Sequence, residues 1–268
     1  IVVGKQEGDH PFSDLLFLTY SYPWQAIRHL RRLGSKQTIF YGDFYMAYYF
    51  ILAGVPYFFT YHDNWPEQAK FDWKNRLRGL FYIPLYRWII RRANSVATVS
   101  AYKYEFVKRL NPNSSLIRNG VNAPQTKKAP CLIKPEQKLR LLMLGNVDDR
   151  KFGLAVDLFN TISRHHTIPF CQIDVYGHIK DKSLANRLKS FSFVKLHGFT
   201  DRVDYSNYHL YLCTSKMENL SIAVCEALIN YTPVLSFDVG GHGEVIQHLK
   251  TGILIAPGNI DQFYDYLQ

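Results

Sequence analysis

Short runs of hydrophobic residues alternate along the whole chain with longer segments in which hydrophobic residues recur at helical spacing. Residues 38–41, 56–62 and 95–100 are rich in β-branched and aromatic residues and predict strands in the first half. Leu139–Leu144 and Cys171–Tyr176 predict buried strands in the second half. Strands that alternate with helices in this way are typical of α/β domains with parallel sheets.

The segments between these strands give the expected helices, and three weaker runs give further strands. We expect helices at residues 24–33, 44–52, 102–110, 154–164, 220–229 and 261–267, and further strands at residues 115–117, 194–196 and 209–213. Residues 70–92 form one more long helical stretch. Because proline lacks the N–H group that a regular helix uses, we expect Pro84 to divide this stretch into two helices.

The regular pattern is interrupted between residues 124 and 138, where three prolines and four lysines occur. We interpret residues 124–138 as a linker between an N-terminal Rossmann-like domain, residues 1–123, and a C-terminal Rossmann-like domain, residues 139–268. Two such domains are expected to face each other across a cleft. The chain opens without an initiator methionine, so we expect its N-terminus to be incomplete, and we also expect a final helix to be missing.

Polar residues and glycines collect directly after the predicted strands. In open parallel sheets, ligands bind at the carboxyl ends of the strands. The sequence therefore predicts a ligand site at this edge of the sheets. The residues at these positions are His62, Asn119, Gly145, Gly177, His197, Gly198, Glu218, Gly240 and Gly241.

Two carboxylates mark the helix predicted at residues 220–229. Glu218 precedes this helix and Glu226 lies within it, although its other residues are apolar almost all round, which is typical of a buried helix. A buried carboxylate is destabilising unless it is paired or hydrogen-bonded. These two carboxylates either form an ordinary salt bridge or cap the helix, or they bind the hydroxyl groups of a ligand. Phosphates of such a ligand would lie at the helix N-terminus, which favours anions.

The spacing of the residues around these carboxylates resembles that of a known family. Glu218 and Glu226 stand eight positions apart, Pro233 and Val234 follow, and a Gly-Gly-x-x-Glu-Val-Ile sequence begins at Gly240. This order resembles the nucleotide-sugar domain of retaining glycosyltransferases with the GT-B fold, and in particular glycosyltransferase family 4. The resemblance covers nearly the whole chain.

The resemblance implies roles for the residues of this site. Glu226 would accept hydrogen bonds from the ribose hydroxyls of the donor, and Glu218 would contact the hydroxyls of the donor sugar. His62 would lie near the reacting carbon of that sugar. Glu218, His62 and Lys151 are the expected catalytic residues. Phosphate and sugar oxygens would be held by the backbone N–H groups of Asn219, Leu220, Ser221 and Ile222. The loop with Gly198, Phe199 and Thr200 would lie along the nucleobase. Gly177 would complete the donor site.

A basic pair after Leu139–Leu144 is expected to bind the diphosphate. In the family, a Gly-Arg pair and a lysine five residues after that arginine neutralise this group. Here Gly145 and Lys151 fall in register, whereas Asn146 occupies the arginine position. We expect Arg150 to replace the arginine, because two cations at a strand exit stabilise the departing nucleotide. The alternative is a solvated loop in which these cations pair with the neighbouring aspartates.

The net charge of +10 is carried by one half of the chain. Residues 1–130 contain 18 Lys and Arg against 8 Asp and Glu, whereas residues 131–268 contain 14 of each kind. The segment from Lys70 to Arg92 carries seven basic residues against one acid, with aromatic residues interleaved. This composition predicts docking on an anionic membrane surface, and the alternative is a half-buried helix pair with a charged outer face. Nucleic acid is another partner of such patches, but no RNA- or DNA-binding motif is present, so we expect none.

Three absences from the sequence narrow the chemistry further. No Asp-x-Asp motif and no His/Cys cluster with ligand spacing occurs, so we expect no metal cofactor. The four cysteines show no C-x-x-C spacing, which indicates reduced thiols in a cytosolic protein. No apolar run is long enough to span a bilayer, so we expect a cytoplasmic protein that is peripheral on the inner face of the membrane.

The resemblance, together with these features, implies a metal-independent, retaining glycosyltransferase. It would move a hexose from a nucleotide sugar, with UDP as the expected nucleotide, to a lipid-linked or polysaccharide sugar. Two alternatives share the fold: a weakly active subunit that supports a partner glycosyltransferase, which Asn146 favours, and a sugar-nucleotide epimerase. A basic nucleic-acid-binding protein is a third alternative, and it predicts salt-dependent binding to polynucleotides.

Overall fold

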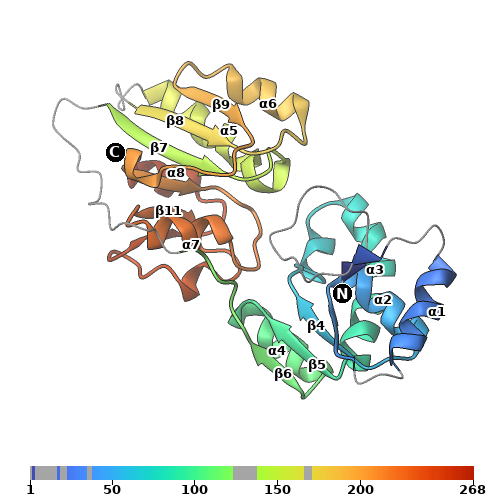
Figure 1. Ribbon diagram of the computed structural model, residues 1–268. Helices are drawn as coiled ribbons and strands as arrows, with labels where there is room; N and C mark the ends of the chain where they lie inside the picture. The colour runs from blue at the N-terminus through green and yellow to red at the C-terminus, as the bar shows by residue number, and fades with distance from the viewer. Residues whose placement is uncertain (1, 4–16, 19–22, 35–37, 123–137, 166–170) are drawn as a thin grey trace. The chain divides into compact units, whose positions relative to one another are not determined.

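The computed structural model describes residues 2–3, 17–18, 23–34, 38–122, 138–165 and 171–268, which divide into two compact units (Figure 1). Unit 1 spans Ile1–Arg118 and unit 2 spans Asn119–Gln268. The main sheet of each unit is parallel, and helices pack against it. The prediction of an α/β fold with parallel sheets is therefore confirmed.

Unit 1 contains a four-stranded parallel sheet in the order β3-β4-β5-β6 and a separate parallel pair, β1 and β2. Its core combines residues of helices and strands, among them Leu30, Phe50, Phe59, Ile89 and Val96. The elements are β1 (Val2–Val3), β2 (Phe17–Leu18), α1 (Pro23–Gly34), β3 (Phe40–Gly42), α2 (Phe44–Ala53), β4 (Tyr57–Tyr61), the 3-10 helix η1 (Glu67–Lys70), α3 (Trp73–Arg92), β5 (Ser95–Thr98), α4 (Ala101–Leu110) and β6 (Ser114–Leu116).

Unit 2 contains a six-stranded parallel sheet in the order β12-β11-β10-β7-β8-β9. The elements are β7 (Leu139–Leu144), α5 (Asp149–His165), β8 (Cys171–Tyr176), α6 (Lys182–Lys189), β9 (Val194–Gly198), η2 (Tyr205–Asn207), β10 (Leu210–Cys213), α7 (Ile222–Ile229), β11 (Val234–Phe237), η3 (His242–Glu244), β12 (Gly252–Ile255) and α8 (Ile260–Asp265). This is the doubly wound order, and such sheets bind ligands outside the carboxyl ends of the strands where the order reverses, here β7 and β10.

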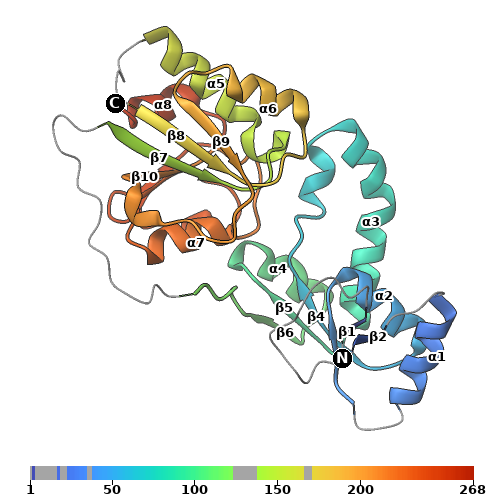
Figure 2. The same ribbon diagram turned by 45° about the horizontal axis from the view of Figure 1, so that its top comes forward.

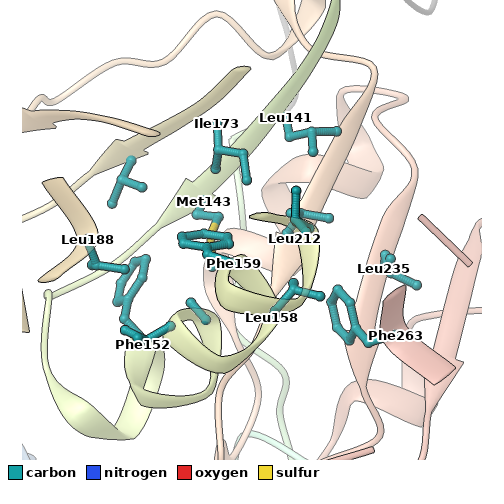
Figure 3. Packing of buried hydrophobic residues seen from close by; sticks show 14 of the residues in the cluster. Leu141, Met143, Phe152, Leu158, Phe159, Ile173, Leu188, Leu212, Leu235 and Phe263 are labelled. Atoms are coloured by element: carbon teal, nitrogen blue, oxygen red, sulfur yellow. The ribbon is translucent and has the colours of Figure 1, made fainter. Parts of the chain in front are cut away.

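Successive residues of β7 point to opposite faces of the sheet, and each face has its own core. Leu141 and Met143 pack with Phe152 and Phe159 of α5 (Figure 3). Leu142 belongs to a separate cluster that includes residues of α7. Figure 2 shows α5 and α6 on one side of the sheet and α7 on the other. Because the sheet is covered on both faces, its central strands appear in the sequence as continuous apolar runs.

Aspartate side chains set the beginnings of two helices in unit 2. Asp148 accepts a hydrogen bond of 3.0 Å from the backbone N–H of Lys151, so α5 begins five residues before its predicted start at residue 154. Asp181 caps α6 in the same way, accepting the N–H of Leu184 at 3.0 Å. This helix was not predicted because it is short and mostly polar.

Helix α3 runs through Pro84 without a break, so the prediction that Pro84 divides it was wrong. The helix begins at Trp73, directly after the cap residue Asp72, whose side chain accepts the N–H of Asn75 at 2.7 Å. Gly79 and Tyr86, on either side of the proline, are buried and hold both halves of the helix against unit 1. This packing outweighs the hydrogen bond that the proline removes.

Some predictions concern residues outside those that the structure describes. The predicted linker lies almost wholly in residues 123–137, and Cys131 lies there too. In the described part of the chain, Cys213 and Cys225 form no disulfide bond. Of the helices described, none combines the length and the apolar character needed to cross a membrane.

Candidate active site

A cavity of about 1120 Å³ opens at the carboxyl edge of the unit 2 sheet. It lies outside the ends of β7 and β10, where the strand order reverses, and reaches the ends of β8 and β9. The structure thus brings residues from four strand exits together in one wall. The predicted site residues in this wall are Gly145, Asn146, Lys151, Gly177, Phe199, Glu218, Leu220, Ser221, Ile222 and Glu226.

Eight predicted site residues do not belong to this wall. Seven of them are part of unit 2 but do not line the cavity: Asn119, Arg150, His197, Gly198, Asn219, Gly240 and Gly241. His62 belongs to unit 1, where its side chain is exposed and lines a separate cavity of about 490 Å³ together with Tyr41. The role expected for His62 therefore stays a prediction.

Glu218 is the centre of a charged cluster at this site. Its Oε1 atom lies 3.2 Å from Nη1 of Arg150 and 3.3 Å from Nζ of Lys151, and the hydroxyl of Ser215 donates to it at 3.0 Å. Glu218 is only 8% exposed, and these three contacts offset its lost hydration. Both cations thus pair with Glu218, in contrast to the alternative expectation that they pair with the neighbouring aspartates.

The pKa of Glu218 lies below the ordinary value of 4.5. Burial raises this pKa, but the positive charges of Lys151 and Arg150, the nearby His242 and the hydrogen bond from Ser215 outweigh burial. A group with a lowered pKa in the folded state stabilises the fold above its unfolded pKa, and this contribution is lost as the pH falls through the folded pKa.

We therefore expect Glu218→Gln to be less stable than the wild type at pH 7, by about 2 kcal/mol, because charged hydrogen bonds are lost. The difference should shrink as the pH falls below 4.5, the unfolded pKa, toward the lower folded pKa. Urea titrations at several pH values, followed by circular dichroism, measure it. Asp157→Asn, which changes an exposed carboxylate on α5, is the control. A difference between wild type and Glu218→Gln that does not vary with pH would contradict the prediction.

Glycines are required where the backbone crowds around this cluster. A Cβ atom at Gly177, which has a φ of 145°, would lie 1.8 Å from the carbonyl oxygen of Gly145. A Cβ atom at Gly240, which has a φ of 60°, would lie 1.8 Å from the carbonyl oxygen of Glu218. A Cβ atom at Gly145 would lie 2.6 Å from Cδ of Lys151. These glycines permit the close approaches that position the charged side chains.

Glu226 lies on α7 in the cavity wall and is held there by a tyrosine. The hydroxyl of Tyr205 donates a hydrogen bond of 2.9 Å to its Oε2 atom. Burial, reinforced by the charge of Glu226, raises the pKa of Tyr205, so the hydroxyl stays protonated and donates. The expectation that α7 is buried on every side was wrong, because Ile222 is 48% exposed and lines the cavity. One apolar face of α7 packs on the sheet and another borders the cavity.

The N-terminus of α7 opens on the same cavity. The helix begins at Ile222, after Ser221, whose side chain makes no capping hydrogen bond. The first N–H groups of a helix have no partner within the helix, and they favour anions. Because Leu220, Ser221 and Ile222 line the cavity together with Lys151, this helix end can bind an oxyanion there.

Aromatic rings line the cavity at the ends of β8 and β9. His178 and Phe199 stack with their centroids 4.3 Å apart and their planes inclined by 7°, and both belong to the wall. His197, in contrast, bonds through Nε2 to Asp174 at 2.7 Å and stacks on Tyr176 at 4.5 Å. His197 therefore supports the end of the sheet, whereas His178 and Phe199 offer a flat surface to a planar group.

Sequence reasoning missed several residues of the wall. Tyr205 belongs to η2, in a loop without periodicity, so nothing around it marked it as the partner of Glu226. His178 directly follows Gly177 at the end of β8. It could have been predicted, because ligands bind at the carboxyl ends of parallel strands. Other wall residues that were not predicted are Asn122, Leu144, Tyr176, Asp201, Arg202, Val203, Ala223 and Asn230.

Two curated proteins are similar to part of the chain. It is 27% identical over 113 residues to the GtfA subunit of the UDP-N-acetylglucosamine–peptide N-acetylglucosaminyltransferase of Streptococcus pneumoniae, covering 40% of this chain and 22% of that protein. It is 29% identical over 101 residues to the same subunit of Streptococcus gordonii, covering 35% of this chain and 20% of that protein. The match thus spans about one fifth of the length of these relatives.

Solved structures share the architecture across nearly the whole chain. HepE of Anabaena, solved in complex with UDP-glucose, gives a TM-score of 0.70 at 17% identity, covering 94% of this chain and 74% of that chain. The lipopolysaccharide outer core galactosyltransferase WaaB gives a TM-score of 0.67 at 16% identity, covering 95% and 74%. At these identities the likeness shows the fold, which is that of GT-B glycosyltransferases.

Two family descriptions together match most of the sequence. The family "Glycosyltransferase Family 4" matches residues 2–124 of unit 1 and the start of unit 2. The family "Glycosyl transferases group 1" matches residues 132–268, which is about half of the chain and contains the whole sheet of unit 2. The chain therefore belongs to the glycosyl transferases group 1 family and has the GT-B fold.

Proposed function

We propose that this chain is a retaining glycosyltransferase that moves a hexose from a nucleoside diphosphate sugar to a sugar acceptor. The observation that carries the proposal is the cation cluster at Glu218, which shares one cavity with the N-terminus of α7 and with Glu226. Lys151 and the helix N–H groups suit a diphosphate, and Arg150, which pairs with Glu218 but does not line the cavity, adds to the positive charge. Glu226, oriented by Tyr205, suits the ribose hydroxyls.

The reaction breaks the bond between the anomeric carbon and the phosphate oxygen. Negative charge then develops on the departing diphosphate, where Lys151 and the N-terminus of α7 stabilise it. Retention by double displacement requires a carboxylate nucleophile beside the anomeric carbon. Glu226 is bonded to Tyr205 and is assigned to the ribose. We therefore favour attack from the face on which the nucleotide leaves, with the leaving phosphate taking the acceptor proton.

UDP is the nucleotide that the comparisons favour. The GtfA relatives are named for UDP-N-acetylglucosamine, and HepE was solved with UDP-glucose. The flat pair of His178 and Phe199 offers a stacking surface to the base. Metal-independence is part of the proposal, because Lys151, Arg150 and the helix end supply the positive charge. Equal activity in excess EDTA and in Mg²⁺ or Mn²⁺ supports it, and activity that requires an added metal would overturn this part.

The test is binding and hydrolysis of UDP-, GDP- and dTDP-sugars by the intact chain. We expect one donor class to bind, and Glu226→Ala to weaken that binding by about 100-fold, because two charged hydrogen bonds to the ribose are lost. Isothermal titration calorimetry measures the affinity. Asp157→Ala, on the exposed side of α5, is the matched control and should bind as the wild type does. If no donor binds, the enzyme proposal falls.

A subunit that supports a partner glycosyltransferase is the second candidate, and the names of the GtfA relatives favour it. It predicts weak or absent transfer by the chain alone and transfer after a partner chain is added. An epimerase of the same fold would instead convert the sugar of the donor without an acceptor. Nuclear magnetic resonance of the sugar products distinguishes transfer, hydrolysis and epimerisation in one experiment.

A further inference from the structure

Helix α3 has one buried face and one exposed apolar face. Tyr86, Ile89 and Ile90 pack into the core of unit 1. The opposite face carries large apolar side chains that the proposed reaction does not use. We call these five residues the apolar ridge: Trp73 (67% exposed), Leu77 (59%), Leu80 (74%), Phe81 (69%) and Trp88 (39%).

The apolar ridge is continuous along the helix. Its residues are separated by four, three, one and seven positions, so at 3.6 residues per turn they fall within about 100° of the helix circumference. From Trp73 to Trp88 the ridge extends over about 22 Å at 1.5 Å per residue. Pro84 is also exposed on this side of the helix. Exposed apolar surface of this extent marks an interaction site in soluble proteins.

Positive charges border the apolar ridge on both edges. By helical position, Arg76 and Arg87 follow one edge, and Lys74 and Arg78 follow the other; all four are exposed. Arg91 and Arg92 add two charges at the C-terminal end, and α3 contains no Asp or Glu. Among the residues that the structure describes, no carboxylate lies within salt-bridge distance of these six cations.

The geometry points to α3 as a docking surface for an anionic lipid bilayer, with the helix lying in the plane of the interface. The apolar ridge would enter the boundary of the acyl chains while the flanking cations meet the lipid phosphates. Tryptophan at both ends of the ridge suits this boundary, where its amphipathic ring is favoured. This inference deepens the proposed function, because it places unit 1 at the surface that carries a lipid-linked acceptor.

The arrangement fits a bilayer better than the other polyanions. Nucleic acid binds cations through its phosphates, but it leaves an apolar ridge between two rows of cations unexplained. A bilayer accounts for both parts, since apolar insertion and charge attraction act together on an interfacial helix. Each cation near the surface contributes about fivefold in affinity, which is about 1 kcal/mol.

Co-sedimentation of the full chain with vesicles tests the inference. The probes are phosphatidylcholine vesicles with and without phosphatidylglycerol, at about 0.1 M salt and at higher salt. Two variants change the surface: Leu80→Gln/Phe81→Gln removes the centre of the apolar ridge, and Arg76→Gln/Arg87→Gln removes one row of charges. The matched controls are Ile117→Gln, which changes an exposed apolar residue elsewhere in unit 1, and Lys182→Gln/Lys189→Gln, which removes two exposed cations of α6.

We expect binding to the anionic vesicles alone, weakened by salt. The charge variant should bind about thirtyfold more weakly, which is about 2 kcal/mol. The ridge variant should bind at least tenfold more weakly, and both controls should bind as the wild type does. Unchanged far-ultraviolet circular dichroism and unchanged donor affinity show that the variants are folded, and they separate this test from that of the proposed function.

Three outcomes would overturn the inference. The first is no binding to either vesicle, and the second is equal binding by the wild type and both variants. The third is a change in oligomeric state on size-exclusion chromatography in the ridge variant without a change in vesicle binding, which would show that the apolar ridge is an interface between protein chains. Retained donor binding in any of these cases would leave the proposed glycosyltransferase activity intact.

Discussion

Replacing Lys151 by alanine is expected to lower kcat/KM for the sugar nucleotide by about 10²- to 10³-fold, the range found when one preorganised group that stabilises developing charge is removed. The ammonium of Lys151 lies 3.3 Å from Glu218, and its side chain runs across Gly145 in the cavity wall. This cation is thus in place before the donor arrives, and it meets the charge that develops on the leaving diphosphate. We expect most of the loss to fall on kcat, because that charge is greatest in the transition state.

Lys216→Ala is the matched control for this effect. Lys216 lies near α5 and pairs with the exposed Asp149 at 2.8 Å, but it does not line the cavity. Exposed ion pairs contribute at most about 1 kcal/mol to stability, so this variant should keep kcat/KM within about twofold of the wild type. Steady-state kinetics with a saturating acceptor measure both variants. Similar losses in the two, or none in Lys151→Ala, would contradict the assignment.

Gly240→Ala is expected to lower the free energy of unfolding of unit 2 by about 2–4 kcal/mol. Alanine at a φ of 60° is disfavoured by about 1 kcal/mol, and overpacking adds about 1–3 kcal/mol. The new Cβ would lie 1.8 Å from the carbonyl oxygen of Glu218 and 3.0 Å from that of Asn219. The N–H of Gly241 donates to the carbonyl of Asn219 at 2.6 Å, so relief of the clash also shifts the backbone that carries Glu218.

Gly258→Ala separates the clash from the backbone strain. Gly258 has a similar φ of 77°, but a Cβ atom there meets nothing within 4 Å, so we expect a loss of about 1 kcal/mol. Hydrogen exchange of peptides from β10 and α7 is the measurement, because all four tryptophans lie in unit 1 and their fluorescence does not report on unit 2. Equal destabilisation by both substitutions would show that the contact with Glu218 has no effect of its own.

The central strands of unit 2 were predictable because a strand that is buried on both faces appears in the sequence as a continuous apolar run. β7 and β8 have the boundaries that the sequence predicted, Leu139–Leu144 and Cys171–Tyr176. α6 and β12 were missed because both are short, and because α6 buries little more than Leu184, Ala185 and Leu188. The hydrophobic periodicity of a short amphipathic segment is hard to recognise among polar residues. The stability of such a segment comes from tertiary packing, which the sequence pattern does not show.

The candidate site was predictable where it follows from the ends of the strands. Gly145, Gly177 and Glu218 follow β7, β8 and β10, and the doubly wound sheet brings them to one edge. The contact between Tyr205 and Glu226 was not predictable, because it joins a loop to a helix 21 positions away. Pro84 shows the opposite case, in which a local rule fails because buried neighbours keep the helix intact.

The ion cluster around Glu218 has a consequence for the turnover of the proposed enzyme. Its carboxylate occupies the positive field of Lys151 and Arg150 when no donor is bound, so an incoming diphosphate exchanges one anion for another. The net gain of such an exchange is smaller than the attraction of a diphosphate to two unpaired cations. Glu218 thereby acts as a competitor that belongs to the chain itself. We expect this competition to weaken the binding of the spent nucleotide and so to speed its release.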